Sequence, residues 1–190
     1  MLRLARAIHW QRYSTRRYII SSGDALSRQK ALELEREIGT GTFTIHVIPR
    51  ARKVHQSYHT SVFTTIWSLT TCLWLISIRP LVANKSCKFA DVVLLNGPGS
   101  CVPIVVAAFL PRVLGLPFTK LVYIESFART KKLSMSAKLV RPFVDRFFVQ
   151  WESLKQALSD DEPQRKSDEP SAGSSRWRLQ ARVEYQGWLV

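Results

Sequence analysis

Apolar runs alternate along this chain with stretches of helical periodicity, and the alternation predicts an α/β fold. Runs that predict strands lie at residues 17–21, 43–48, 92–95, 120–125 and 147–150. Segments that predict helices lie between them, at 27–38, 61–78, 102–114 and 134–145. We expect Ser27 and Ser134 to cap two of these helices. Repeated β/α alternation favours one doubly wound parallel sheet.

The run Val92–Leu95 leads into a turn that predicts an anion site. Its apolar residues do not alternate with polar ones, which is typical of a central parallel strand covered on both faces. The segment Asn96-Gly97-Pro98-Gly99-Ser100 then opens the next helix. Glycines let backbone amides approach a ligand, and a helix start directs unpaired N–H groups at the same place. The local signal is also that of an ordinary tight βα connection.

The segment Ser61–Ile78 is uncharged over eighteen residues, which is long enough to raise the question of a membrane span. Seven of those residues are Ser or Thr. We therefore expect a buried or membrane-surface helix rather than one that spans lipid. Upstream, Pro49-Arg50-Ala51-Arg52-Lys53 places three cations after a predicted strand, either as a solvated loop or at a ligand edge.

Both ends of the chain differ in composition from its centre. Residues 1–11 predict a basic amphipathic helix, which is typical of either a mitochondrial presequence or a surface helix. Residues Ser159–Ser175 hold five acidic and two basic residues among Ser and Pro, and we expect a disordered insertion there. Beyond it, Tyr185, Gly187, Trp188, Leu189 and Val190 are apolar enough to predict docking on another surface.

The net charge of +14 indicates a polyanionic partner. No Lys/Arg run or nucleic-acid-binding motif accompanies it, so we expect no nucleic acid but an anionic membrane surface or a phosphorylated ligand. Three cysteines without paired spacing predict reduced thiols, and four histidines show no metal-ligand pattern. We therefore predict neither a metal nor a cofactor. A free-standing Rossmann nucleotide-binding enzyme would need Gly-x-Gly-x-x-Gly after its first strand, which is absent.

Several motifs in order resemble a single family. They are Ile48-Pro49-Arg50, Val54-His55-Gln56-Ser57, Asn96-Gly97-Pro98-Gly99, Val102-Pro103, Glu125-Ser126, Arg129, Leu133-Ser134-Met135-Ser136, Lys138 and Val149-Gln150-Trp151. The chain is similar in these residues to the asparagine-linked glycosylation "fourteen" family. That family is the membrane-anchoring, acceptor-side subunit of the two-chain UDP-N-acetylglucosamine transferase of dolichol-linked oligosaccharide synthesis. The motifs also resemble bacterial capsule and exopolysaccharide proteins of the same superfamily.

The resemblance implies a Rossmann-like acceptor half of a split GT-B glycosyltransferase. It implies that residues 1–158 form this domain, that residues 159–175 are the insertion, and that residues 176–190 dock on the catalytic subunit. The partner is a small UDP-GlcNAc-binding chain of the asparagine-linked glycosylation "thirteen" type. The expected location is the cytosolic face of the endoplasmic reticulum membrane or the nuclear envelope, and the expected acceptor is dolichyl-diphosphate-GlcNAc.

The start of the chain departs from the family pattern. Members normally begin with a membrane-spanning helix, a first strand and a glycine-rich loop, whereas Met1-Leu2-Arg3-Leu4 matches the helix just after that loop. We expect a truncated gene model. A sheet without its first strand leaves neighbouring strands with unpaired edges. Ala137 also stands where the family tends to have Gly.

The resemblance and the anion site together give a set of candidate residues. We expect the backbone of Asn96, Gly97, Gly99 and Ser100 to bind the acceptor diphosphate, with Arg129 and Lys138 as charge partners. Ser134 and Ser136 belong to the same candidate site, although helix capping is the commoner role for such residues. Glu125 is either a general base or an ion-pair partner of Arg129, and we favour the pair. The alternative function is a membrane scaffold that binds no acceptor.

Overall fold

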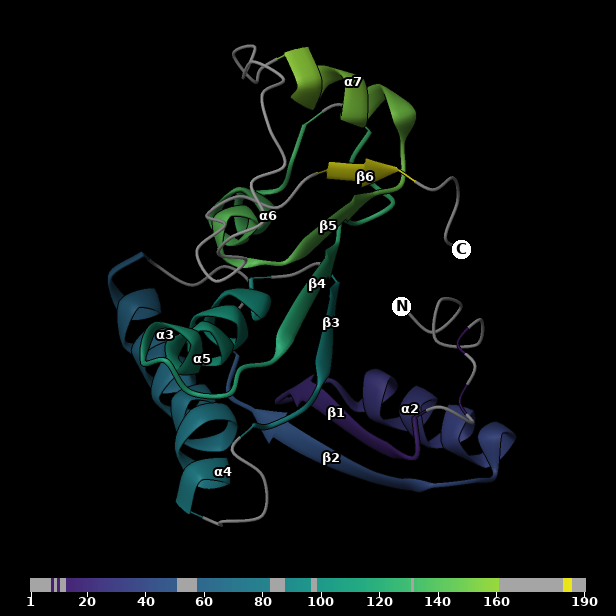
Figure 1. The fold of residues 1–190 in the computed structure, drawn as a ribbon, viewed down its shortest axis with the longest axis vertical. Coiled ribbons are helices and arrows are strands. Elements are labelled where there is room, and N and C mark those ends of the chain that lie inside the picture. Colours follow the sequence, from purple (N-terminus) through teal and green to yellow (C-terminus); the bar gives the residue numbers. More distant parts are fainter. Residues whose placement is uncertain are drawn as a thin grey trace. The chain divides into compact units, whose positions relative to one another are not determined.

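The structure is a computed structural model, and it describes residues 8, 10, 13–50, 58–82, 88–96, 99–130, 132–160 and 183–185. The chain divides into two compact units, one built almost entirely from residues up to Thr71 and the other from Cys72 to Trp188. Each unit has its own parallel sheet (Figure 1). Most of the predicted helix at residues 1–11, most of the predicted insertion, and residues 186–190 lie outside the described residues.

The first unit is a β-α-β element followed by a helix. Strands β1 (Thr15–Ser21) and β2 (Thr42–Ile48) pair in parallel over their full length, and helix α2 (Ala25–Ile38) connects them. Asp24, not the predicted Ser27, is the N-cap of α2, because its carboxylate accepts hydrogen bonds from the backbone N and Oγ of Ser27 at 3.0 and 2.7 Å. Helix α3 (Tyr58–Cys72) follows β2.

A buried ion pair joins β1 to α2. Nε and NH2 of Arg16 donate to the two carboxylate oxygens of Glu35 at 2.8 and 2.7 Å, and Tyr18 Oη donates to the same carboxylate at 2.5 Å. Arg16 and Glu35 are 6% and 7% exposed. Gly41 lies against this network with φ +85°, and a Cβ there would lie 2.5 Å from the carbonyl oxygen of Ser14. Only glycine fits this position without a shift of the backbone.

The second unit contains a four-stranded parallel sheet. Its order is β3 (Val92–Asn96), β4 (Lys120–Ile124), β5 (Arg146–Val149) and β6 (Val183–Tyr185). Tyr123 of β4 stacks on Phe147 of β5 with ring centroids 5.2 Å apart, and both side chains are fully buried. The α/β fold with parallel strands and intervening helices is confirmed.

Helices precede, connect and follow the strands of this sheet along the chain. They are the π-helix Leu73–Ile78, α4 (Arg79–Val82), α5 (Cys101–Val113), α6 (Met135–Val140), the 3₁₀ turn Arg141–Phe143 and α7 (Glu152–Asp160). Pro111 lies inside α5 and cannot donate to the carbonyl of Ala107. The hydroxyl of Ser77, on the π-helix, donates to that carbonyl at 2.5 Å instead. The proline is therefore accommodated by a neighbouring helix.

The structure corrects three expectations about the elements. The strands form two sheets rather than one, in the orders β1-β2 and β3-β4-β5-β6. The strand Val92–Asn96 is consequently an edge strand, and Val92 and Leu94 are exposed rather than covered.

The other two corrections concern helices. The helix after Ser134 ends at Val140 rather than near Asp145, because Pro142 cannot continue it and a 3₁₀ turn follows. Helix α7 was not expected at all, and it includes Ser159 and Asp160, the first two residues of the predicted insertion.

Candidate functional site

The predicted anion loop follows β3 at the carboxyl end of the strand. Asn96 ends β3, and Gly99 and Ser100 form the turn that starts α5, whereas Gly97 and Pro98 lie outside the described residues. Ser100 is the N-cap residue, but its side chain makes no capping hydrogen bond. Val102 N–H donates to the carbonyl of Gly99 at 3.2 Å. The turn thus places the start of a thirteen-residue helix beside the loop, as the sequence predicts.

Cys101 begins α5 and lies directly beneath this loop. It is 6% exposed, and burial raises the pKa of its thiol to about 12, against the opposing effect of a hydrogen bond with the backbone of Asn96. A thiol with so high a pKa is protonated at neutral pH and is a poor nucleophile. Cys101 therefore acts as a small packing residue in the floor of the loop.

Helix α6 carries both predicted serines, and one of them lies at the same loop. Ser134 caps this helix, because its Oγ accepts a hydrogen bond from the backbone N of Ala137 at 3.1 Å, and the predicted capping role is confirmed. Ser136 lies two residues further on, and a Cβ added at Gly99 would lie 3.8 Å from its Oγ. Gly99 and Ser136, predicted from separate motifs, are therefore neighbours.

Glu125, at the end of β4, holds the segment that connects β4 to α6. Its carboxylate accepts hydrogen bonds from Ser126 N at 2.8 Å and from both N and Oγ of Ser134 at 3.1 Å. The residue is 1% exposed. Among the described residues Glu125 makes no ion pair with Arg129, so the expected pair is wrong, and its carboxylate bonds to Ser126 and Ser134 instead. Glu125 thus fixes the two ends of the connecting segment relative to each other.

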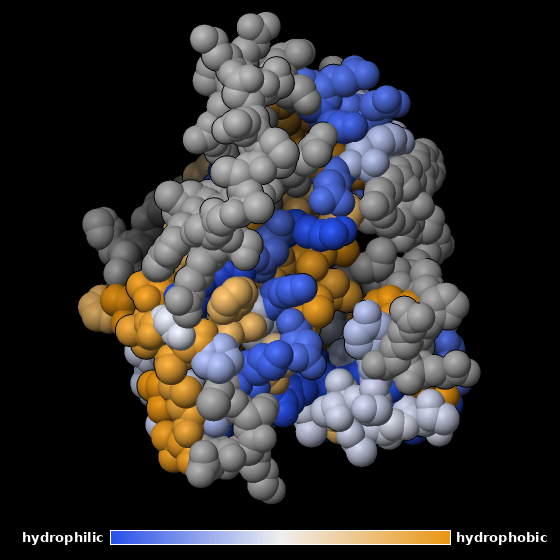
Figure 2. Space-filling view, in the orientation of Figure 1, coloured by the Kyte–Doolittle hydropathy of each residue, from blue (hydrophilic) through white to orange (hydrophobic). Residues whose placement is uncertain are grey.

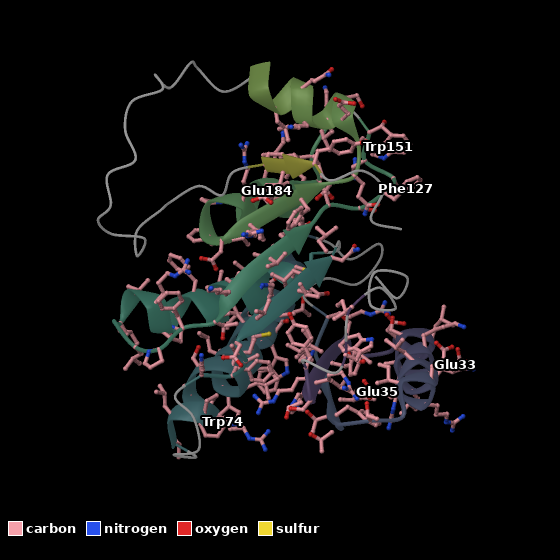
Figure 3. The ribbon with its side chains drawn as sticks, turned by 45° about the vertical axis from the view of Figure 1, so that its right-hand side comes forward. Glu33, Glu35, Trp74, Phe127, Trp151 and Glu184 are labelled. Atoms are coloured by element: carbon pink, nitrogen blue, oxygen red, sulfur yellow. The ribbon has the colours of Figure 1, made fainter. Side chains whose placement is uncertain are left out.

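Side chains that follow β5 also form hydrogen bonds to the segment that connects β4 to α6. Gln150 Nε2 donates to the carbonyl of Glu125 at 3.0 Å, Trp151 Nε1 to that of Phe127 at 2.7 Å, and Ser153 Oγ to that of Thr130 at 3.1 Å. The rings of Phe127 and Trp151 also pack with centroids 4.9 Å apart (Figure 3). The described residues of the β4–α6 loop, 125–130 and 132–134, are therefore held at five backbone positions.

The two predicted cations extend from this fixed scaffold into solvent. Arg129 lies at the centre of the β4–α6 loop, in a turn where its own backbone N–H donates to the carbonyl of Ser126 at 3.0 Å. Lys138 lies on α6, and both residues are exposed. Neither side chain makes a hydrogen bond or ion pair to the Asn96–Ser100 loop within the described residues. The structure therefore brings Gly99 and Ser136 together and leaves the two long side chains available to an added anion.

The sequence interpretation did not assign Gln150 and Ser153 to the site. Gln150 and Trp151 stood in a quoted motif, but their partners are backbone carbonyls 24 to 25 residues away. A polar residue directly after a buried strand was the available signal, because that position lies at the sheet edge where ligands bind. The neighbouring aromatic Trp151 packs on Phe127, which is 42% exposed.

The predicted partner segment is described only in part. Tyr185 ends β6, which pairs in parallel with β5 so that Val149 lies opposite Tyr185. Glu184 lies opposite Phe148 and approaches Arg146, with NH1 and Oε2 3.7 Å apart. Gly187, Trp188, Leu189 and Val190 lie outside the described residues. The segment that precedes them is thus part of the sheet of the second unit.

One helix in the described part of the chain, Phe63–Val82, is long and apolar enough to cross a membrane. Less than a third of its most apolar window is buried. Apolar residues gather along the left edge of Figure 2, where Figure 1 places α3 and α4. The large exposed apolar side chains of the helix Phe63–Val82 are Phe63, Ile66, Trp67, Trp74, Ile78, Leu81 and Val82. Among the described residues, no group of three or more His, Cys, Asp or Glu side chains is placed to hold a metal.

Comparisons with known proteins give a consistent match. The family described as "Oligosaccharide biosynthesis protein Alg14 like" matches residues 1–164. The chain is 48% identical over 146 residues to the UDP-N-acetylglucosamine transferase subunit ALG14 of Candida albicans, and 43% identical over 154 residues to that of Schizosaccharomyces pombe. It is 41% identical over 151 residues to the human protein of the same name.

These alignments cover 76%, 81% and 76% of this chain, in the same order, and 62%, 70% and 66% of the relatives. The chain therefore spans about two thirds of the length of the curated relatives that it matches. No solved structure gives a significant match.

Proposed function

Because this chain belongs to the Alg14 family of oligosaccharide biosynthesis proteins, we propose that it is a subunit of a UDP-N-acetylglucosamine transferase. In this proposal it adds the second GlcNAc to GlcNAc-diphosphodolichol together with a small UDP-GlcNAc-binding chain, and it has no transferase activity alone. The observation that carries the proposal is the identity of 39–48% to curated subunits of that name, from fungi to mammals, across both units of the fold.

The candidate site supports an acceptor-binding role. The Asn96–Ser100 loop presents the start of α5, and Ser136 lies beside it, so backbone amides and a hydroxyl can bind phosphate oxygens. Arg129 and Lys138 reach into solvent from elements that are held in place, and they supply the positive charge that a diphosphate requires. Ser134 contributes by capping α6.

Glu125 acts in this proposal as a positioning residue rather than as the general base. A base must reach the proton that it removes, whereas both oxygens of this buried carboxylate already accept hydrogen bonds from the protein. Its role is to fix the β4–α6 loop and thereby the backbone that carries Arg129.

Attachment to membrane and partner completes the proposal. The apolar helix Phe63–Val82 and the excess of basic residues support association with the cytosolic face of the endoplasmic reticulum membrane. The residues after β6, from Gly187 to Val190, dock on the catalytic chain and recruit it to that membrane.

Transfer to the lipid acceptor by the two-chain complex tests this function. We expect Arg129→Ala and Lys138→Ala each to lower kcat/KM for GlcNAc-diphosphodolichol by roughly tenfold or more, because each charge-assisted hydrogen bond contributes about 1.5–3 kcal/mol. The measurement is transfer of labelled GlcNAc from UDP-GlcNAc, with co-purification of the two chains measured in parallel.

Lys120→Ala is the matched control, since Lys120 is an exposed cation at the opposite end of β4. Unchanged turnover in both site variants would remove Arg129 and Lys138 from the site. Co-purification without any dependence of transfer on the Asn96 loop would instead favour the scaffold function.

A further inference from the structure

The carboxyl ends of the four strands in the second unit form one edge of its sheet. All neighbouring pairs among β3, β4, β5 and β6 are parallel, so these ends lie side by side in that order. The edge begins at the Asn96–Ser100 loop, continues through the β4–α6 loop and Trp151, and ends at Tyr185. The candidate acceptor site therefore shares this edge with the strand that leads to the docking segment Gly187–Val190.

Two apolar side chains of the β4–α6 segment are exposed. Glu125 accepts hydrogen bonds from the backbone N of Ser126 at 2.8 Å and of Ser134 at 3.1 Å, so one carboxylate holds both ends of the loop. Phe127 and Met135 directly follow these serines and are 42% and 79% exposed. The core of the second unit thus leaves much of both side chains uncovered, and Glu125 keeps their backbones close together.

Trp151 fixes the position of Phe127. Its Nε1 donates to the carbonyl of Phe127 at 2.7 Å, and the two rings pack with centroids 4.9 Å apart (Figure 3). Aromatic residues and Met are enriched in protein interfaces, and a side chain that is fixed before binding loses little entropy when a partner binds. Phe127, Met135 and Trp151, the edge surface, therefore have the composition and the preorganisation of a protein-binding site.

Charges of both signs border the edge surface. Arg129 lies two residues after Phe127, whereas Glu152 directly follows Trp151, and both of these charged residues are exposed. An anionic membrane attracts clusters of cations, whereas a polar rim around an apolar centre is typical of protein interfaces. The edge surface therefore fits a protein better than a lipid bilayer.

The strand that leads to the docking segment ends beside the edge surface. Tyr185 lies opposite Val149, and Trp151 follows Val149 by two residues. Neighbouring strands lie about 4.8 Å apart, so the end of β6 is next to the chain that carries Trp151. Stable interfaces use about 20–30 residues on each side, so a partner held by Gly187–Val190 needs further contacts nearby. The edge surface supplies exposed apolar contacts at that place.

We propose that Phe127, Met135 and Trp151 form a second docking surface for the small UDP-GlcNAc-binding chain, beside the segment Gly187–Val190. This inference rests on the proposed function and adds a folded surface to the segment that docks there. The β4–α6 loop also carries Arg129, so the bound chain lies next to the cation that the proposed function assigns to the acceptor diphosphate. Partner docking and acceptor binding thus use the same loop.

Calorimetry of the complete chain with the purified UDP-GlcNAc-binding chain tests this surface. We expect Met135→Asp and Phe127→Ala each to raise Kd at least tenfold. Met135 is mostly exposed and begins α6, where the helix dipole favours Asp, so Met135→Asp should retain the thermal unfolding midpoint of the wild type. With the partner in excess over the raised Kd, this variant should transfer GlcNAc at the wild-type rate, whereas Arg129→Ala should not.

Leu114→Asp is the matched control, because Leu114 is 61% exposed and follows α5 at the opposite edge of the same sheet. We expect it to bind the partner with the wild-type Kd. Wild-type Kd in both Met135→Asp and Phe127→Ala, or an equal loss in Leu114→Asp, would overturn the docking surface. An unchanged partner Kd would also overturn it where Met135→Asp instead lost binding to phosphatidylserine vesicles or lost self-association.

The same measurements separate this inference from the proposed function. Normal GlcNAc transfer with wild-type Kd in the edge-surface variants would leave the proposed function intact without this docking surface. A wild-type complex that forms but transfers no GlcNAc would overturn the proposed function, whereas the effect of Met135→Asp on Kd would still decide the docking surface.

Discussion

At the scale of single residues, the strongest interactions in this chain are structural. The Arg16–Glu35 pair is bidentate, buried and supported by Tyr18, and it joins the first strand to the first long helix. Although desolvation opposes ionisation, hydrogen bonds from Arg16 and Tyr18 lower the pKa of Glu35 below its ordinary value. The same environment raises the pKa of Tyr18. The stability of this unit therefore depends on a charged carboxylate.

Replacing Glu35 by Gln should destabilise the fold by about 3–5 kcal/mol at pH 7, because it leaves Arg16 buried without a counter-charge. Since the folded-state pKa of Glu35 is depressed, its contribution is complete above its unfolded pKa and is lost as pH falls through the folded pKa. The difference in free energy of unfolding between wild type and variant should therefore become smaller at acidic pH. Urea unfolding at pH 7 and below pH 4 measures both effects.

Glu33→Gln is the control, because Glu33 lies on the same helix in an exposed pair with Lys30 (Figure 3). We expect no measurable loss of stability from it. A Glu35 variant as stable as this control would contradict the proposed role of the buried pair.

At the scale of elements, most of the secondary structure could be predicted because its signals are local. The β-branched run before Ser22 and the apolar run before Asn96 predict strands whose observed ends differ by no more than two residues. The predicted N-cap of α2 lay three residues after the observed one, because Asp24 and Ser27 bond to each other at the helix start and either residue type suits an N-cap.

The candidate site was less predictable than its elements. The sequence identified residues at strand ends and helix starts, such as Gly99 and Ser134, because those positions follow from the order of elements. It could not show that Glu125 bonds to Ser126 and Ser134, or that Trp151 reaches the carbonyl of Phe127, since these partners depend on the tertiary path of the loop. The edge position of β3 likewise depends on strand order.

The contact between Ser77 and α5 belongs to this scale. We expect Ser77→Ala to lower the free energy of unfolding by about 1–2 kcal/mol. Pro111 has no N–H to donate to the carbonyl of Ala107, so the variant leaves this carbonyl without the hydroxyl donor that replaces it. Chemical denaturation measures the change. Thr70→Ala should cost less, since its exposed hydroxyl bonds only to Trp67 within its own helix; equal losses would show that Ser77 has no special role.

The β4–α6 loop gives a second prediction for elements. Trp151→Phe keeps the aromatic ring and removes the N–H that bonds to Phe127, so local opening of the loop should become easier by about 1 kcal/mol. Amide hydrogen exchange of residues 126–133 should then be roughly fivefold faster. Trp74→Phe, at an exposed position elsewhere, should leave this exchange unchanged. Equal rates in wild type and Trp151→Phe would show that the bond does not hold the loop.

At the scale of the whole molecule, the net charge of +14 and the apolar helix Phe63–Val82 would both favour binding to an anionic membrane surface. We expect the chain to bind vesicles that contain phosphatidylserine more strongly than neutral phosphatidylcholine vesicles, and to dissociate as salt rises. Vesicle flotation measures this. Ile66→Asp should weaken binding to both vesicle types, because it places a charge on the exposed helix surface; equal binding of wild type and variant would exclude this helix from the contact.

β6, the fourth strand of the second unit, is the shortest strand of its sheet. It pairs with β5, although the stretch between Asp160 and Val183 separates it from the preceding helix in the sequence. Three residues offer few backbone bonds, so the pairing relies on the high effective concentration that a covalent connection provides. Cutting the chain between α7 and β6 would therefore release the strand by dilution.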